Sequence, residues 1–335
     1  MSARRLAAWL LGAAVLLAPA LLMTGYHLFQ LTSTAIYCIA ILGLDIVTGY
    51  TGQVSLGHGA FYAIGAYVTA ILMTDFNWPF WATLPVAGGA SAVVGFLVGF
   101  PALRLSGPYL ALVTLALAYA VPQILRAKAL EAWTGGAQGI VVTPPDAPGF
   151  LPLSQDQYLY LCTIVVAIAL YLIARNMLRG RQRRAMVAIR DHALAAEAVG
   201  IDIARVKTRA FAVSASFTGI AGALSAVVVQ FVAPDSFSAT LSIALFVGLV
   251  VGGAASIPGT VVGAAFVQFV PNLAELVSKS APGAIYGVLL VAALYLMPGG
   301  AAGAVRRLLS RRASARWLSA TPAKTAKQGA TIHVE

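Results

Sequence analysis

Ten stretches of predominantly apolar sequence, each about the length of one membrane-spanning helix, follow one another along the 335-residue chain. A helix needs about 20 apolar residues to cross the roughly 30 Å hydrocarbon core of a bilayer. The stretches cover approximately residues 6–24, 28–48, 54–74, 80–101, 107–125, 157–175, 209–232, 239–256, 258–276 and 283–299. Only 10% of the residues are charged, against about 25% in a soluble domain. The sequence therefore predicts an all-α, polytopic transmembrane helical bundle of about ten spans.

The eighth and ninth stretches are separated only by residues 255–257, which precede Pro258. A helical hairpin and a pair of broken helices both fit so short a separation. Pairs of glycines four residues apart let helix backbones approach each other closely. We expect three such pairs to serve helix packing, namely Gly95/Gly99, Gly248/Gly252 and Gly259/Gly263.

The distribution of Lys and Arg predicts the orientation, because positively charged loops stay on the cytoplasmic side during insertion. If the amino terminus is cytoplasmic, 19 of the 22 Lys and Arg residues lie on the cytoplasmic side. Two of these 19 precede the first span, one is Arg104, nine lie between Arg175 and Arg209, and seven lie from Arg306 to Lys327. Both termini are then cytoplasmic. We expect a transmembrane domain over residues 1–303 with a cytoplasmic loop at 176–208, and a basic, disordered or membrane-surface tail at 304–335.

The amino-terminal stretch has some features of a secretory signal, with Ala18-Pro19-Ala20 as a small-residue cleavage site. It is also long enough to span the membrane, so we expect it to be retained. The remaining topology is the same in either case.

The net charge of +11 does not indicate nucleic-acid binding, because the basic residues flank spans and the aromatic residues lie inside them. Contact with anionic membrane lipid explains the charge instead. The two cysteines, Cys38 and Cys162, both lie in apolar stretches. Neither a disulfide framework nor a metal site is therefore expected.

Ionisable residues inside spans are costly and are therefore candidates for function. Asp45 lies near the inner end of the second stretch and His58 begins the third. Each could equally be a structural group bonded to backbone or hydroxyl groups. Between them, Gly52, Gln53 and Ser55 belong to a glycine-rich polar run whose backbone either lines a translocation path or makes a tight interfacial turn.

An outer loop after the fifth stretch carries Thr134, Gly135 and Gly136, followed by a proline-rich segment. It is either a connector or a surface for a soluble partner at the mouth of a path. A proton-driven carrier would need a relay of several ionisable groups in its helices, and an intramembrane enzyme would need a recognisable motif such as His-Glu-x-x-His. The sequence has neither, so we expect no catalytic residues in this chain.

The basic segment from Arg179 to Arg209 holds eight of the 22 Lys and Arg and is too long for a plain connector. Asp191 is a favourable N-cap, and Gly200 stands where a glycine closes a helix, so a short helix is predicted over 192–199. Ala193, Ala196 and Gly200 would give it a smooth face that fits a groove of another protein. Alternatively, the helix lies on the lipid surface.

These residues carry a resemblance to a known family. Residues 195–201 (AAEAVGI) resemble the EAA-type coupling loop of bacterial ABC importer permeases. Residues 49–61 (GYTGQVSLGHGAF) are similar to a signature of the branched-chain amino-acid permease family, the LivH/LivM family. Further matches lie at residues 101–111 (PALRLSGPYLA), 134–136 (TGG) and 217–224 (FTGIAGAL), and within the family the chain resembles the LivM type.

The resemblance implies an inner-membrane permease subunit of an ATP-driven importer for branched-chain, hydrophobic amino acids. Its implied partners are a LivH-like second permease, two LivG/LivF-like cytoplasmic ATPases and a periplasmic substrate-binding protein. The chain has no Walker A motif, so ATP and Mg would be used by the partner ATPases. Coupling to them is implied for Arg190, Asp191, Ala195, Ala196, Glu197 and Gly200.

Candidates for the translocation path are Asp45, Gly52, Gln53, Ser55, His58, Thr134, Gly135 and Gly136. The resemblance also admits a permease for urea or short amides, which shares the same sequence pattern. A secondary carrier working without an ATPase is a more distant alternative. One departure from the family is the spacing around Glu197, which is shorter than in the widest EAA consensus.

Overall fold

The computed structural model describes residues 18–19, 23, 25–102, 105, 107–148, 153–277, 279, 281–296 and 299–303. The tail at 304–335 and nearly all of the predicted first span, 6–24, lie outside the described residues. The long apolar helices are α2 (Tyr26–Asp45), α3 (His58–Thr74), α4 (Phe80–Ala102), α5 (Pro108–Leu125), α7 (Gln155–Met177), α10 (Ile203–Val229), α11 (Ala239–Gly252), α12 (Ile257–Val277) and α13 (Pro282–Leu296). Shorter helices are η1 (Ile46–Tyr50), η2 (Lys128–Leu130), α6 (Glu131–Thr134), α8 (Arg181–Asp191), α9 (Ala193–Ala198) and η3 (Pro234–Phe237).

The predicted all-α transmembrane bundle is confirmed. Seven of the described helical segments are long and apolar enough to cross a membrane, and two shorter apolar helices lie at His58–Thr74 and Gly283–Ala292. "About ten spans" is therefore a loose count for the described part of the chain. The one sheet there is a pairing of two-residue strands, β1 (Ile140–Val141) and β2 (Phe231–Val232), in which Ile140 faces Val232.

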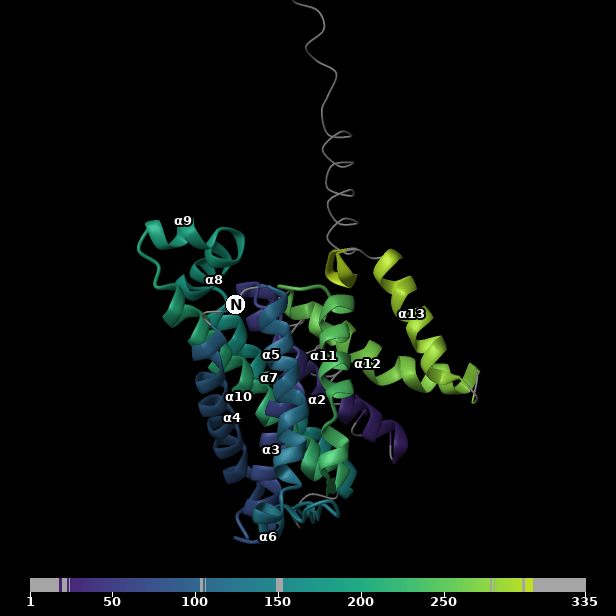
Figure 1. Ribbon diagram of the computed structural model, residues 1–335. Helices are drawn as coiled ribbons and strands as arrows, with labels where there is room; N and C mark the ends of the chain where they lie inside the picture. The colour runs from purple at the N-terminus through teal and green to yellow at the C-terminus, as the bar shows by residue number, and fades with distance from the viewer. Residues whose placement is uncertain are drawn as a thin grey trace, which may run out of the picture.

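Helix α10 forms the centre of the bundle and packs against α2, α3 and α4 (Figure 1). Its small residues make this close packing feasible. A Cβ added at Gly222 would overlap the carbonyl oxygen of Tyr62 on α3, and one added at Gly65 of α3 would overlap the carbonyl of Gly219. The backbones of α3 and α10 are therefore in direct contact, as small residues permit inside membranes.

The three predicted glycine pairs all lie at helix contacts. Gly95 and Gly99 of α4 face Ala215 and Phe211 of α10. Gly248 and Gly252 of α11 meet Gly263 and Gly259 of α12, backbone against backbone. The eighth and ninth stretches are consequently two separate helices packed as a hairpin, joined by residues 253–256.

Helices α8 and α9 project at one end of the bundle, and α6 lies at the opposite end (Figure 1). Helix α13 stands at the side, where it packs on α12 and α11. These two ends are called the α8–α9 end and the α6 end below.

Helix α7 starts with a capping box, in which the Ser154 hydroxyl accepts from the Gln157 N–H and the Gln157 side chain accepts from the Ser154 N–H. Ser154→Ala should lower the free energy of unfolding by about 1 kcal/mol, because a helix N–H loses its partner. Thermal unfolding in detergent measures the change. Ser238→Ala is a matched control, since Ser238 holds the N-cap of α11 without a side-chain bond. Equal effects at both positions would contradict the role of the box.

Candidate functional site

Helix α2 does not continue directly into α3, and the intervening residues 46–57 are called the helix break. Residues 46–50 form the π-helical turn η1, Gly52 adopts a left-handed φ of 72°, and residues 53–57 have no regular secondary structure. The predicted third span at 54–74 therefore starts as a helix only at His58. Single π-helical turns inside helices are frequent at functional sites.

Polar backbone groups of the helix break and of the start of α3 are bonded to hydroxyl side chains, two of which lie on other helices. The Thr114 hydroxyl of α5 accepts from the Leu56 N–H at 2.9 Å, and the Ser242 hydroxyl of α11 accepts from the Gly59 N–H at 2.8 Å. The Thr48 hydroxyl donates to the Gln53 carbonyl at 3.0 Å. Irregular backbone at membrane depth is tolerated only when it is satisfied in this way or faces water.

His58 lies at the start of α3, is fully buried and joins two hydroxyls. Its Nδ1 is 3.0 Å from the Ser55 Oγ, and its Nε2 is 2.6 Å from the Ser214 Oγ. The Ser214 hydroxyl is also 2.6 Å from the Gly43 carbonyl, which can only accept, so Ser214 donates to it. We therefore assign the proton to Nε2, which donates to Ser214, while Nδ1 accepts from Ser55. This chain connects α2, α3 and α10 through one neutral imidazole.

Asp45 is fully buried at the last residue of α2. Its Oδ1 accepts from the Ala255 N–H at 2.7 Å, in the connection between α11 and α12. Its Oδ2 has no hydrogen-bond partner among the described residues. Asp45 was expected to be either a functional group or a structural carboxylate bonded to backbone or hydroxyl groups. The bond of Oδ1 fits the structural role, whereas Oδ2 could still accept a hydrogen bond from a further donor.

The predicted path residues of the helix break lie together, inside the chain. Gln53, Ser55 and His58 are buried, whereas Gly52 is exposed beside α8. The segment makes an internally bonded re-entrant turn, and in this chain alone those three side chains do not face open solvent. Their role in a translocation path stays a prediction.

Thr134, Gly135 and Gly136 lie at the α6 end, away from the helix break (Figure 1). The Thr134 Oγ1 lies 2.8 Å from the Leu125 carbonyl and 3.0 Å from the Leu130 carbonyl, and its hydroxyl can donate to either. It also accepts from the Gly136 N–H. Both glycines have left-handed φ values. The motif therefore shapes a tight turn beside the end of α5, and the structure does not bring it together with the other predicted path residues.

The predicted coupling helix is partly wrong in its limits. Asp191 does not cap it, since it ends the preceding helix α8, and its carboxylate accepts from the Arg190 Nε at 3.0 Å. The extended residue His192 separates α8 from α9, so the helix covers Ala193–Ala198. The sequence reading placed no helix at 181–191. Its buried residues Met186 and Ile189 recur at the spacing of a helix face, which was the available signal.

Gly200 behaves as predicted. It has a φ of 83°, its N–H donates to the Glu197 carbonyl, and the next N–H, of Ile201, donates to the Ala196 carbonyl. This is the Schellman motif of a glycine that ends a helix.

The predicted small-residue face of α9 is only partly accessible, because Ala196 is buried while Ala193 is half-buried and Gly200 is exposed. Ala196 is buried because α9 packs on α8 and α10. The exposed surface carries Ala195 and Glu197, with Leu194 and Val199 exposed by 84% and 77%. A partner that docks on α9 would therefore meet the apolar side chains of Leu194 and Val199 beside the carboxylate of Glu197.

Arg190 bonds to the bundle while its side chain is 35% exposed, so its predicted contact with an ATPase stays a prediction. Its Nη1 donates to the Gly49 carbonyl at 3.1 Å, so the α8–α9 end is bonded directly to the helix break. Sequence reasoning likewise missed Thr114, which bonds to the helix break, and Ser214 and Ser242, which bond to residues of α2 and α3 beside it. Small hydroxyl residues inside apolar stretches are their only sequence signal.

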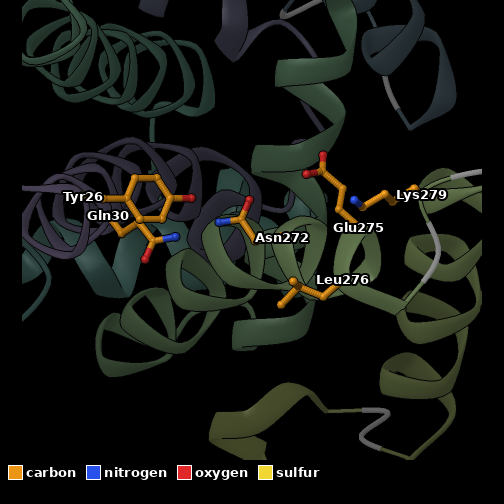
Figure 2. A pocket seen from close by; sticks show the side chains of 6 residues that line it. All are labelled: Tyr26, Gln30, Asn272, Glu275, Leu276 and Lys279. Atoms are coloured by element: carbon orange, nitrogen blue, oxygen red, sulfur yellow. The ribbon is translucent and has the colours of Figure 1, made fainter.

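A groove of about 600 Å³ lies between the start of α2 and the end of α12 (Figure 2). Its lining combines a carboxylate, an ammonium group and two amides in an otherwise apolar surface, from Tyr26, Gln30, Asn272, Glu275, Leu276 and Lys279. It lies away from α8 and α9. The sequence reading did not single out these residues.

Comparison with known proteins gives consistent results. Residues 26–297 match the family described as "Branched-chain amino acid transport system / permease component". The chain is 37% identical over 248 residues to proteins of Salmonella typhimurium and Escherichia coli K12, each named "High-affinity branched-chain amino acid transport system permease protein LivM". Each alignment covers 67% of this chain and 58% of the relative, so the chain spans less than two thirds of those proteins. No solved structure matches the chain.

Proposed function

Because the chain belongs to the permease-component family of branched-chain amino acid transport systems, we propose that it is a membrane subunit of an ATP-driven importer of branched-chain amino acids. The observation that carries this proposal is the extent of the family match, residues 26–297, which includes every long helix from α2 to α13. The names of the two relatives favour amino acids over urea or short amides as substrates.

The partners in this proposal are a LivH-like second permease, two cytoplasmic ATPases of the LivG/LivF type and a periplasmic substrate-binding protein. The chain itself carries no catalytic site, and the ATPases use ATP and Mg. The protein lies in a bacterial inner membrane with both termini cytoplasmic. The excess of Lys and Arg around α8 supports a cytoplasmic position for the α8–α9 end.

The mechanism follows from the arrangement of the two ends. Closure of the ATPase dimer would push on α9, whose exposed Leu194, Glu197 and Val199 supply the contact surface. Helix α9 packs on α8 and α10, so the push reaches the centre of the bundle. Alternating access then results from movement of packed helices past one another.

The groove of Figure 2 supports an amino acid as the substrate. An α-amino acid carries an ammonium and a carboxylate group, and Glu275 and Lys279 supply one charge complementary to each. Urea carries neither charge, so it would make only hydrogen bonds with such a pair and no ionic interaction. The groove therefore fits a zwitterion better than a neutral amide.

Uptake into proteoliposomes tests the proposal. The chain, its permease partner, the ATPases and the binding protein are reconstituted, and uptake of radiolabelled leucine and of urea is measured with and without ATP. We expect ATP-dependent uptake of leucine that requires the binding protein. Uptake driven by an ion gradient alone, or uptake of urea in place of leucine, would refute it.

Gly200→Ala should weaken coupling without disturbing the bundle. An L-residue in the left-handed region costs roughly 1–2 kcal/mol, and no neighbouring atom lies within 4 Å of an added Cβ, so the strain stays local to the end of α9. We expect substrate-stimulated ATP hydrolysis to fall several-fold and membrane insertion to remain normal. The matched control is Gly180→Ala, in the same loop, where space is also open but φ is negative. Normal coupling in Gly200→Ala and in Glu197→Ala would show that α9 is not the docking element.

A further inference from the structure

We propose that Arg190 is a positioning residue that transmits movement of the α8–α9 end to the helix break and to the connection between α11 and α12. This inference rests on the proposed function, since it assigns the residue through which ATPase docking reaches the membrane domain. It differs from a docking role, because it concerns the bond that Arg190 makes to the bundle and not a contact with the ATPase.

The Arg190 guanidinium makes two bonds that lie on opposite sides of the boundary between loop and bundle. Its Nε donates to the Asp191 carboxylate at 3.0 Å, within the α8–α9 end, and its Nη1 donates to the Gly49 carbonyl at 3.1 Å, in the π-helical turn. The side chain is 35% exposed. The planar guanidinium can hold both bonds at once, which the single ammonium of a lysine does with poorer geometry.

Two glycines of the helix break make room for this contact. A Cβ at Gly52 would lie 2.8 Å from the Arg190 Cγ, and Gly52 has a φ of 72°, so a larger residue is disfavoured twice. A Cβ at Gly49 would overlap the Asp45 Oδ1. The glycine content of residues 49–57 is thus required where α8 and Asp45 approach this backbone.

Asp45 extends the connection to a third element. Its Oδ1 accepts from the Ala255 N–H at 2.7 Å, and Ala255 holds a left-handed φ of 58° that is unusual for alanine. Its buried Oδ2 has no hydrogen-bond partner among the described residues, and the positive charge of Arg190 acts on this carboxylate. One guanidinium and one carboxylate therefore join α8, the break between α2 and α3, and the turn between α11 and α12.

This arrangement predicts how a push is transmitted. When α8 shifts, the Gly49 carbonyl is pulled with it or released, and the acceptor that we assign to a freed guanidinium N–H is the buried Asp45 Oδ2, which has no hydrogen-bond partner among the described residues. If the guanidinium exchanges the Gly49 carbonyl for Asp45 Oδ2, the hydrogen bonding of the π-helical turn changes, and so does its conformation. The α11–α12 connection follows because its Ala255 N–H is bonded to the same carboxylate.

The test uses the reconstituted complex with Arg190→Gln. We expect normal assembly and ATP hydrolysis, but uptake per ATP lowered at least about tenfold, because a hydrogen bond from a charged donor is lost. Arg190→Lys should recover only part of the loss. Arg205→Gln is the matched control, since Arg205 lies in the same segment, is 76% exposed and pairs with Asp202. In a cycle with Asp45→Asn, the double variant should be scarcely worse than Arg190→Gln, because both act through one connection.

A second readout separates this inference from the proposed function. Val54→Cys, with Cys38 and Cys162 replaced by alanine, places a thiol in the irregular part of the helix break. Its labelling rate should change when the ATPases bind ATP, and Arg190→Gln should remove that change while Arg205→Gln keeps it. A normal labelling change without leucine uptake would refute the proposed substrate alone. Three results would refute the role of Arg190. Uptake per ATP could be the same in Arg190→Gln as in Arg205→Gln, Arg190→Gln could fail to assemble with the ATPases, or the labelling change could persist in Arg190→Gln.

Discussion

His58→Phe is expected to destabilise the protein severely, by several kcal/mol. The ring fills a similar space, but the Ser55 hydroxyl loses its acceptor and Ser214 loses its donor, both in a fully buried site. Each buried polar group left unpaired costs roughly 1–3 kcal/mol. A fall of roughly 5 °C or more in the midpoint of thermal unfolding in detergent is therefore expected.

The controls for His58 separate its bonds from its size. His58→Gln retains one donor and one acceptor on a flexible side chain and should recover part of the loss. His27→Phe should be close to neutral, because His27 is exposed at the start of α2. If His58→Phe unfolds at the temperature of the His27→Phe protein, the buried chain from Ser55 to Gly43 does not stabilise the bundle.

Gly222→Val is expected to have the largest effect of all, namely loss of the folded monomeric protein. Its side chain would overlap the carbonyl of Tyr62 and approach the Ala66 N–H, so the obstruction is backbone on α3 and not a side chain that can rotate away. Overpacking in a well-packed core typically costs 1–3 kcal/mol when neighbours can shift. Here α3 and α10 must separate along their contact.

The matched control for Gly222 is Gly89→Val in α4, where no atom lies within 4 Å of an added Cβ. Size-exclusion chromatography of detergent-solubilised protein should give a single symmetric peak for Gly89→Val and aggregate for Gly222→Val. A symmetric peak for both would mean that α3 and α10 are not in backbone contact. Gly65→Val should resemble Gly222→Val, because it obstructs the same contact from the α3 side.

The sequence predicted the local features well and the partners of each residue poorly. Gly200 was identified as a helix-ending glycine because that signal is local, requiring only a left-handed residue after a run of good helix formers. Asp191 was wrongly predicted as an N-cap, because its carboxylate pairs with Arg190 and α8 runs on to include it. The bond from Arg190 to the helix break could not be predicted, since its partner Gly49 is 141 residues away in sequence.

The amino-acid pattern was enough to predict a helical membrane bundle, the approximate positions of its apolar helices and the glycines that serve close packing. These properties follow from hydrophobicity and spacing, which each segment carries independently of the rest. The pairing of polar groups became visible only in the folded chain, in which His58 joins Ser55 to Ser214 and Arg190 reaches the helix break. Buried polar groups must find partners, and which partners they find depends on how distant segments are brought together.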